Sequence, residues 1–219
     1  MIGALLVLLC SYLLGSLPTS IIVGKVFFRK DPREHGSGNA GGANAFRVFG
    51  WKGGVPTVLV DVAKGLAATL LISRIPVPPV IPHELVQIAA GCAAIVGHVW
   101  TVFAGFRGGK GVAAAAGMLI GLYPAALLVC LGVFGVTLLS FGIVSVASLC
   151  AALLFPVVVL ILDATGVVHV SPLLFWFSIP VALLIFYTHR ANIGRLVRGQ
   201  ENRFPKLMLF ARIFHKAKT

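Results

Sequence analysis

The chain alternates between long apolar runs and short stretches rich in glycine and basic residues. Several of the apolar runs approach or exceed the roughly 20 residues that an α-helix needs to cross a bilayer. A segment inside the bilayer must satisfy its own backbone hydrogen bonds, so the pattern predicts an all-α membrane bundle. The alternating ten-residue segments that are typical of a transmembrane barrel do not occur in the sequence.

The pattern predicts seven transmembrane helices. Residues 112–162 form a run of 51 residues without a charge. The flanking turn at 103–111 and the C-terminal tail are both basic and should share one membrane side, so this run and the last span must together contain an even number of crossings. Three spans fit the run, with breaks expected at Tyr123-Pro124 and Ser140-Phe141-Gly142. The other four predicted spans are 2–23, 54–72, 85–102 and 172–187.

Charge sets the predicted orientation. The chain is 58% hydrophobic and 11% charged, which is far too apolar for a soluble domain. Of its 18 Lys and Arg residues, 16 fall in the polar loop 25–52, the turn 103–111 and the segment after the last span, 188–219. Basic loops mark the cytoplasmic side, so we expect the N-terminus outside and the C-terminus in the cytoplasm. The net charge of +12 then reflects topology, and no nucleic-acid partner is expected because no soluble domain remains to bind one.

The C-terminal tail, 202–219, mixes basic and apolar positions from residue 204 onward. This mixture is typical of a segment that lies along the anionic inner leaflet of the membrane. A disordered tail is the alternative.

The first candidate for chemistry is the glycine-rich basic turn at 103–111. It departs from the P-loop, because Ala104 stands where the first glycine belongs and Gly111 where Ser or Thr would hold magnesium. Glycines nevertheless let backbone N–H groups turn inward around an anion, and Lys110 adds a positive charge. A tight interhelical turn with cytoplasmic cations is the alternative interpretation.

A second candidate, residues 35–47, has the same character. Ser37, Asn39 and Asn44 offer uncharged hydrogen-bonding groups among the glycines, and Arg47 could bind a phosphate through two parallel hydrogen bonds. A flexible linker is the alternative, but a linker rarely carries two asparagines and an arginine.

A third candidate begins where the last span ends. His189, Asn192 and Arg195 recur at i, i+3 and i+6 if the helix continues. A solvated basic helix end is the alternative. Asp61 and Lys64 lie three residues apart within a span, where ionisable groups are costly, so we expect them to pair with each other or with the loops.

Other polar residues in apolar segments are expected to be structural: His98 as a hydrogen-bonding group, and Ser145 and Ser148 within a packed helix. Residue patterns that are absent from the sequence count against further classes of reaction. Only six residues are acidic and they do not cluster, so a magnesium site is not expected. The sequence also lacks a His-x₄-Asp pattern and a Gly-x-Ser-x-Gly elbow.

Taken together, the three stretches resemble the bacterial acyl-phosphate–dependent glycerol-3-phosphate acyltransferases, the PlsY family. The family patterns are close to GSGN-x-GATN-x-x-R, GH-x-x-P-x-F-x-x-FKGGKGVAT and HR-x-NI-x-RL-x-x-G-x-E. Their counterparts here run over residues 36–47, 97–114 and 189–201, in the same order and spacing. The resemblance covers almost the whole chain and includes the Asp61/Lys64 pair.

The chain departs from the family pattern at a few positions. Ala43 replaces the usual Thr, Thr101 replaces Pro and Arg107 replaces Lys. Gly42 replaces Ala, and Gly142 lies near a position where many members carry arginine.

The resemblance implies a single membrane domain over 1–219 that needs no cofactor or metal. It would transfer a fatty acyl group from acyl phosphate to the sn-1 hydroxyl of glycerol 3-phosphate, giving lysophosphatidate and phosphate without a covalent acyl-enzyme. This is the first step of phospholipid synthesis. The enzyme would lie in the bacterial inner membrane among its lipids, with its active site at the cytoplasmic face. A soluble phosphate acyltransferase would supply the acyl phosphate.

The resemblance also implies roles for individual residues. The active-site segments would be 35–47, 97–114, 140–148 and 189–201. Lys110 and His189 would be catalytic. The implied substrate-binding residues are Ser37, Gly38, Asn39, Asn44, Arg47, Gly108, Gly109, Ser145, Asn192 and Arg195. The implied supporting residues are Asp61, Lys64, His98 and Glu201.

The sequence is compatible with more than one proton acceptor and with more than one function. The hydroxyl proton could pass to His189, or to a phosphate oxygen of the donor with His189 serving mainly to bind. A transporter or exchanger of organic phosphates is the rival function, although the sequence shows no inverted repeats. A purely structural membrane subunit is the third reading, and the ionisable residues Asp61, Lys64 and His189 count against it.

Overall fold

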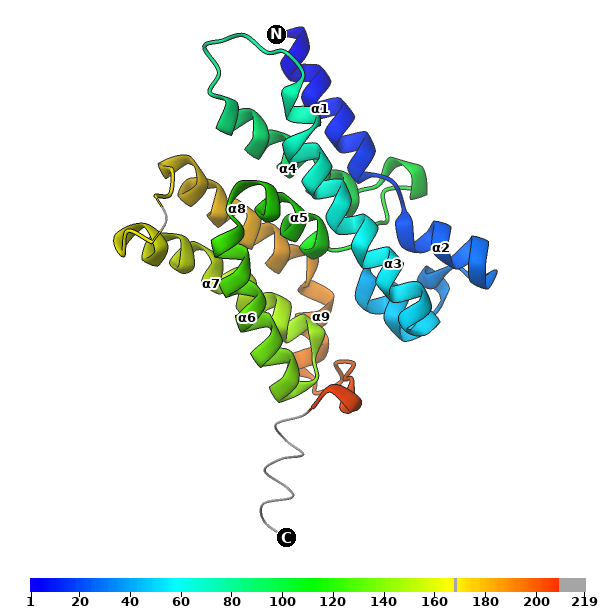
Figure 1. Ribbon diagram of the computed structural model, residues 1–219. Helices are drawn as coiled ribbons and strands as arrows, with labels where there is room; N and C mark the ends of the chain where they lie inside the picture. The colour runs from blue at the N-terminus through cyan, green and yellow to red at the C-terminus, as the bar shows by residue number, and fades with distance from the viewer. Residues whose placement is uncertain (168, 209–219) are drawn as a thin grey trace. The chain divides into compact units, whose positions relative to one another are not determined.

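In the computed structural model the described residues are 1–167 and 169–208, and every regular element among them is a helix (Figure 1). This confirms the predicted all-α class for the described part of the chain. The chain forms two compact units, 1–124 and 125–219, and each is considered by itself.

The first unit contains five α-helices and three short 3₁₀ helices. The α-helices are α1 (Ile2–Gly15), α2 (Thr19–Phe28), α3 (Gly42–Leu70), α4 (His83–Val99) and α5 (Val112–Leu122). The 3₁₀ helices are η1 (Pro32–Glu34), η2 (Ile72–Arg74) and η3 (Val102–Ala104).

The second unit holds the remaining helices of the described chain. They are α6 (Pro124–Phe141), whose first residue belongs to the first unit, α7 (Val144–Ala164), α8 (Pro172–Thr188), α9 (Arg190–Val197) and η4 (Pro205–Leu207). Helix α7 packs against α8.

By length and hydropathy, five stretches of the described residues could cross a membrane: Ile2–Phe28, Gly42–Arg74, His83–Ala104, Pro124–Phe141 and Val144–Ala164. The pair α8 and α9, bent by 58°, would make a sixth. Helix α5 is apolar but has only 11 residues. The count of seven spans and the orientation of the termini therefore stay predictions.

The uncharged run 112–162 divides where the sequence predicted. Helix α5 ends at Leu122 and α6 begins at Pro124, so the break falls at Tyr123-Pro124. Helix α6 ends at Phe141, and Gly142 has a positive φ of 66°, so the second expected break is also confirmed. Glycine adopts this left-handed conformation without the steric cost that a Cβ would bring.

Two details of the first half differ from the prediction. The first span, predicted as 2–23, lies within the candidate span Ile2–Phe28, but its helix is interrupted around Pro18 because proline lacks an N–H and disrupts a helix interior. The polar loop 25–52 is much shorter than predicted, since α2 continues to Phe28 and α3 begins at Gly42, with a kink at Gly50. The positions of the basic residues therefore did not show where the helices end. The aliphatic part of a Lys or Arg side chain can lie along a helix while its charged group reaches water.

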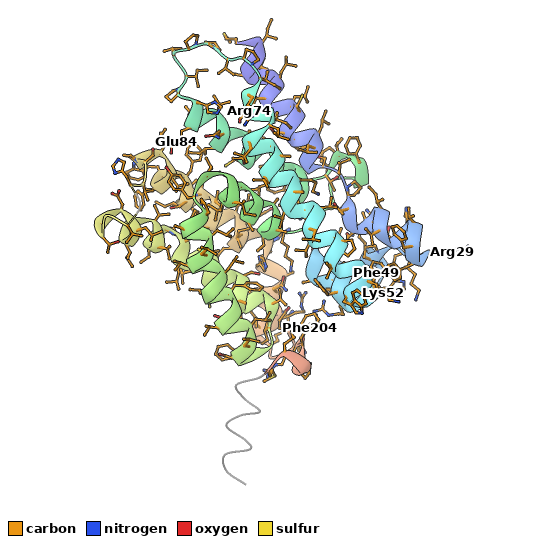
Figure 2. The ribbon with its side chains drawn as sticks, in the orientation of Figure 1. Arg29, Phe49, Lys52, Arg74, Glu84 and Phe204 are labelled. Carbon is orange, nitrogen blue, oxygen red and sulfur yellow. The ribbon has the colours of Figure 1, made fainter. Side chains whose placement is uncertain are left out.

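Small residues bring the helices of the first unit close together. A methyl group at Gly65 of α3 would collide with the carbonyl oxygen of Ala114 in α5, and one at Gly117 would collide with that of Val62. Such glycines let backbones approach in membrane proteins, where van der Waals packing drives helix association. Figure 2 shows Arg29 and Lys52 at one end of this unit and Arg74 and Glu84 at the other.

In the second unit, the segment after α9 returns to the break between α6 and α7. The Phe204 N–H donates to the Gly142 carbonyl oxygen at 2.7 Å, and the Met208 side chain lies against Gly142. The predicted basic tail, 202–219, is described only as far as residue 208. The expectation for its last 11 residues, 209–219, lies outside the described residues.

We expect Gly65→Ala to destabilise the protein and Gly132→Ala to leave its stability unchanged or slightly higher. Both glycines are helical, but a Cβ at Gly65 meets a backbone oxygen, whereas nothing lies within 4 Å of a Cβ at Gly132. Overpacking costs about 1–3 kcal/mol, and removing a glycine from an open helix position gains up to about 1 kcal/mol. The measurement is the thermal unfolding midpoint in detergent. Unfolding is monitored through the reaction of the four free cysteines with a thiol-reactive dye. Equal midpoints for both variants would contradict this account of α3–α5 packing.

Candidate active site

Asn44 organises the glycine-rich loop that precedes α3. Its side chain is almost fully buried, and its Nδ2 donates to the carbonyl oxygens of Pro32 at 2.7 Å, Asn39 at 3.0 Å and His35 at 3.1 Å. Its Oδ1 accepts from the Ser37 N–H at 2.8 Å. The amide group predicted to bind substrate is thus engaged within the loop and holds Ser37 in place.

Arg47 lies one helical turn after Asn44 and is half-buried. A guanidinium nitrogen of Arg47 donates to the Asn44 Oδ1 at 3.4 Å. A methyl group at Gly36 would collide with the Asn44 Oδ1 and would lie 3.3 Å from the Arg47 Cδ. Ser37 and Arg47, both predicted to bind substrate, therefore belong to one local structure built around Asn44.

The basic turn folds back on the end of α4. The N–H of Gly108 donates to the Val99 carbonyl oxygen at 3.1 Å, and the N–H of Gly109 donates to that of His98 at 3.0 Å. Before them, Phe106 has a positive φ of 59° and its N–H donates to the Thr101 carbonyl oxygen at 2.8 Å. These bonds correct the expectation that the two glycine N–H groups face an anion, because both are already donated within the chain.

Two side chains fasten the loop to the turn. Asn39 Nδ2 donates to the Gly108 carbonyl oxygen at 3.2 Å, and a guanidinium nitrogen of Arg33 donates to that of Ala104 at 3.1 Å. The predicted segments 35–47 and 103–111 are therefore brought together within the first unit. Lys110, half-buried, comes directly after the fastened glycines and two residues before α5 begins.

Arg33 is a residue that the sequence analysis missed. It forms an ion pair with Asp31 at 2.8 Å, and Asp31 also accepts from the Arg33 backbone N–H as the N-cap of η1. The side-chain hydrogen bond from Arg33 holds the pKa of Asp31 below its ordinary value, so the pair stays charged at neutral pH. The Asp-Pro-Arg sequence was the available signal, since Asp is a favoured cap before a proline.

Beneath the turn lies a buried ionic cluster. Lys64 Nζ is 2.7 Å from Asp61 Oδ1, which confirms the expected pairing of these residues. Thr19 Oγ1 donates to the same oxygen at 2.9 Å, and His98 Nδ1 lies 3.5 Å from it. Lys64 Nζ also donates to the carbonyl oxygen of Leu17, at 2.8 Å. The cluster thus joins α3, α4 and the break between α1 and α2.

In the second unit, His189 lies at the junction of α8 and α9 and is buried. Its Nδ1 is 2.8 Å from the Ile185 carbonyl oxygen. A carbonyl oxygen can only accept, so Nδ1 carries the proton, and Nε2 holds the lone pair whenever the imidazole is neutral. The ring orientation is therefore set by the last turn of α8.

One carboxylate organises the rest of this motif. Glu201 accepts from Asn192 Nδ2 at 2.7 Å through Oε1 and from Arg195 Nε at 2.8 Å through Oε2. The expected helical continuation after His189 is confirmed by α9, although it bends away from α8. Asn192 and Arg195 thus share Glu201 as a common support.

Ser145 is the second residue of α7, just after the break at Gly142. Its Oγ is buried and has no hydrogen-bond partner among the described residues. The expectation that this hydroxyl bonds the backbone of its helix was therefore wrong, which leaves a hydroxyl able to bind another group.

The structure thus places the predicted residues in two sets, each within its own unit. The first set contains Ser37, Gly38, Asn39, Asn44, Arg47, Asp61, Lys64, His98, Gly108, Gly109 and Lys110. The second contains Ser145, His189, Asn192, Arg195 and Glu201. No group of three or more His, Cys, Asp or Glu side chains that could hold a metal ion occurs among the described residues.

Comparison with known proteins identifies the family. The family described as glycerol-3-phosphate acyltransferase matches residues 5–199 of the chain. Two relatives named glycerol-3-phosphate acyltransferase are similar over nearly their whole length. The protein of Chlorobium luteolum is 45% identical, and that of Chlorobaculum tepidum 44%; each match covers 93% of this chain and 97% of the relative.

Two solved structures are similar in fold and sequence. Both are crystal structures of PlsY (YgiH), described as an integral membrane glycerol 3-phosphate acyltransferase. The glycerol 3-phosphate form has a TM-score of 0.79 and 33% identity, covering 92% of this chain and 95% of that one. The lysophosphatidic acid form has a TM-score of 0.78 and 31% identity, covering 94% and 98%. With its all-helical fold and its three motifs, this chain belongs to the glycerol-3-phosphate acyltransferase (PlsY) family of integral membrane enzymes.

Proposed function

We propose that the chain transfers a fatty acyl group from acyl phosphate to the sn-1 hydroxyl of glycerol 3-phosphate, producing lysophosphatidate and phosphate. The observation that carries this proposal is the direct bond between the loop bearing Ser37 and Arg47 and the turn bearing Lys110. Two cation-bearing segments held together suit a reaction in which both substrates carry a phosphate. Solved relatives in a glycerol 3-phosphate form and a lysophosphatidic acid form support this acceptor and product.

Lys110 is proposed to stabilise the negative charge that develops on the departing phosphate. The amides of Gly108 and Gly109 are donated to α4, so they shape the turn around this lysine. Helix α5 begins two residues after Lys110 and has no side-chain cap, so its first N–H groups add partial positive charge nearby.

In the first unit, Arg47 is proposed to bind a substrate phosphate. In the second unit, Ser145, His189 and Asn192 are proposed to hold glycerol 3-phosphate for attack. The orphaned buried hydroxyl of Ser145 supports this assignment, because such groups in native proteins normally have a partner. The Glu201 carboxylate accepts a hydrogen bond from Asn192 Nδ2, so the Asn192 amide is oriented before substrate arrives.

The proposed reaction needs no covalent intermediate on the enzyme. The sn-1 hydroxyl oxygen forms a bond to the acyl carbonyl carbon, and the bond between that carbon and the phosphate oxygen breaks. Phosphate leaves with the electron pair and, in our proposal, one of its oxygens takes the hydroxyl proton. Because acyl phosphate already carries a good leaving group, an acyl-enzyme would add a step without lowering the barrier.

The proposal has consequences for location and partners. The enzyme would work at the cytoplasmic face of the bacterial inner membrane, with seven spans, the N-terminus outside and the C-terminus in the cytoplasm. The acyl chain would lie among the spans and membrane lipids. A soluble phosphate acyltransferase would supply the acyl phosphate for this first step of phospholipid synthesis.

We expect Lys110→Ala to lower the rate of lysophosphatidate formation by roughly 10²–10³-fold, the usual effect of removing one stabiliser of developing charge. The assay uses purified protein with palmitoyl phosphate and radiolabelled glycerol 3-phosphate, without metal or coenzyme A. Lys52→Ala, which removes an exposed cation from α3, is the control and should stay near wild-type activity.

The same assay can overturn the proposal. If well-folded wild-type protein formed no product from palmitoyl phosphate or palmitoyl-CoA, the transporter reading would take its place. Uptake of phosphate esters into liposomes would then be the next measurement.

We expect His189→Gln to retain kcat within about tenfold while raising KM for glycerol 3-phosphate, because in our proposal the donor phosphate takes the proton. General base catalysis by a side chain typically contributes about 10²–10⁴-fold. The kinetic constants at saturating palmitoyl phosphate separate the two cases. A loss of kcat beyond about 100-fold in a variant with an unchanged unfolding midpoint would instead identify His189 as the base.

A further inference from the structure

His98 contacts the basic turn with both its backbone and its side chain. Its carbonyl oxygen accepts the Gly109 N–H at 3.0 Å. A methyl group at Gly109 would collide with the imidazole Nε2, while one at Gly108 would collide with the His98 carbonyl oxygen. The two glycines before Lys110 therefore rest directly on this histidine.

The opposite edge of the imidazole faces the buried ionic cluster. Nδ1 lies 3.5 Å from both Asp61 Oδ1 and Lys64 Nζ. The ammonium group of Lys64 is held in turn by the carbonyl oxygens of Gly15 and Leu17, at 3.2 and 2.8 Å. The ring is thus fixed on one edge by groups from α3, and on the other edge it supports the turn.

Burying this cluster is costly, since each ion loses several kcal/mol of hydration that its partners must offset. Its members are almost fully buried, with exposed side-chain fractions of 1% for Asp61, 3% for Lys64 and 6% for His98. A well-packed apolar cluster could join the helices at lower cost. The polar cluster, unlike an apolar one, fixes the orientation of the His98 imidazole beneath the turn.

We propose that His98 is a positioning residue for Lys110. Asp61 and Lys64 fix the imidazole, the imidazole supports Gly109, and the ammonium of Lys110 is thereby held where it contacts the phosphate of the acyl donor. This inference rests on the proposed function, because it assigns the donor phosphate to Lys110. His98 itself contacts the turn and is given no contact with substrate.

The test is a pair of double-mutant cycles measured with palmitoyl phosphate. Gly109→Ala should lower kcat/KM for the donor by roughly 10²-fold, since a misplacement of about 1 Å can cost that much. His98→Ala removes the ring that the new methyl group meets, so the double variant His98→Ala/Gly109→Ala should recover to within about tenfold of His98→Ala alone. Gly108→Ala is the matched control. Its methyl group meets a backbone oxygen, so adding His98→Ala should give no recovery.

Conservative variants separate positioning from general stability. A glutamine amide nitrogen reaches about as far as Nε2, whereas an asparagine amide nitrogen corresponds to Nδ1. His98→Gln should therefore keep more of kcat/KM for palmitoyl phosphate than His98→Asn, while KM for glycerol 3-phosphate and the unfolding midpoint stay near wild type in both. Additive losses in both cycles, or unchanged donor kinetics in His98→Ala, would overturn the proposal.

A wild-type protein without activity toward palmitoyl phosphate would refute the proposed function and the assignment of the donor phosphate to Lys110, and the positioning of Lys110 by His98 would then be tested separately. In that case the same double-mutant cycles would be measured through phosphate binding. The observable is the increase in unfolding midpoint when inorganic phosphate is added. Recovery of that rise in His98→Ala/Gly109→Ala, and not in His98→Ala/Gly108→Ala, would uphold the positioning role. No recovery in either would reject it.

Discussion

The ion pair between Asp61 and Lys64, one turn apart inside α3, is the interaction on which the rest of the first unit depends. Both charges are buried, and their lost hydration must be offset within the protein. Thr19 donates to the carboxylate, and two carbonyl oxygens at the break between α1 and α2 accept from the ammonium. Two carbonyl oxygens at the interruption around Pro18, those of Gly15 and Leu17, therefore help to satisfy the buried ammonium group. An interruption in one helix and an ion pair in another stabilise each other.

From this pair the structure extends outward to the glycine-rich segments. His98 joins the cluster to the turn, and Asn39 and Arg33 join the turn to the loop before α3. The backbone amides of Gly108 and Gly109 are used in building the turn, so in the proposed mechanism charge recognition falls to Lys110 and Arg47. A turn fixed by internal hydrogen bonds would hold Lys110 in place before the substrate binds, which is the kind of preorganisation that favours stabilisation of developing charge.

The second unit follows the same principle with different groups. The Ile185 carbonyl oxygen fixes the ring of His189, and the Glu201 carboxylate fixes Asn192 and Arg195 together. His189 and Asn192, two of the side chains proposed to meet substrate, are thus oriented by a neighbour before substrate arrives, whereas the Ser145 hydroxyl has no such partner among the described residues. If the donor is acyl phosphate, as we propose, it already carries its leaving group, and orientation and charge stabilisation are then the main contributions that the protein can make.

The all-helical class, the breaks at Tyr123-Pro124 and Gly142, the pairing of Asp61 with Lys64 and the family could be predicted from the residues alone. These features depend on local hydropathy, on turn chemistry or on residues within one helical turn, all of which can be read along the chain. The bond from the Gly109 amide to α4, and the support that Glu201 gives to two side chains of α9, emerged only from the fold. These hydrogen bonds join residues that are separated by a turn or by several helical turns. The chain offers many donors and acceptors of the same kind, so the sequence does not show which donor meets which acceptor.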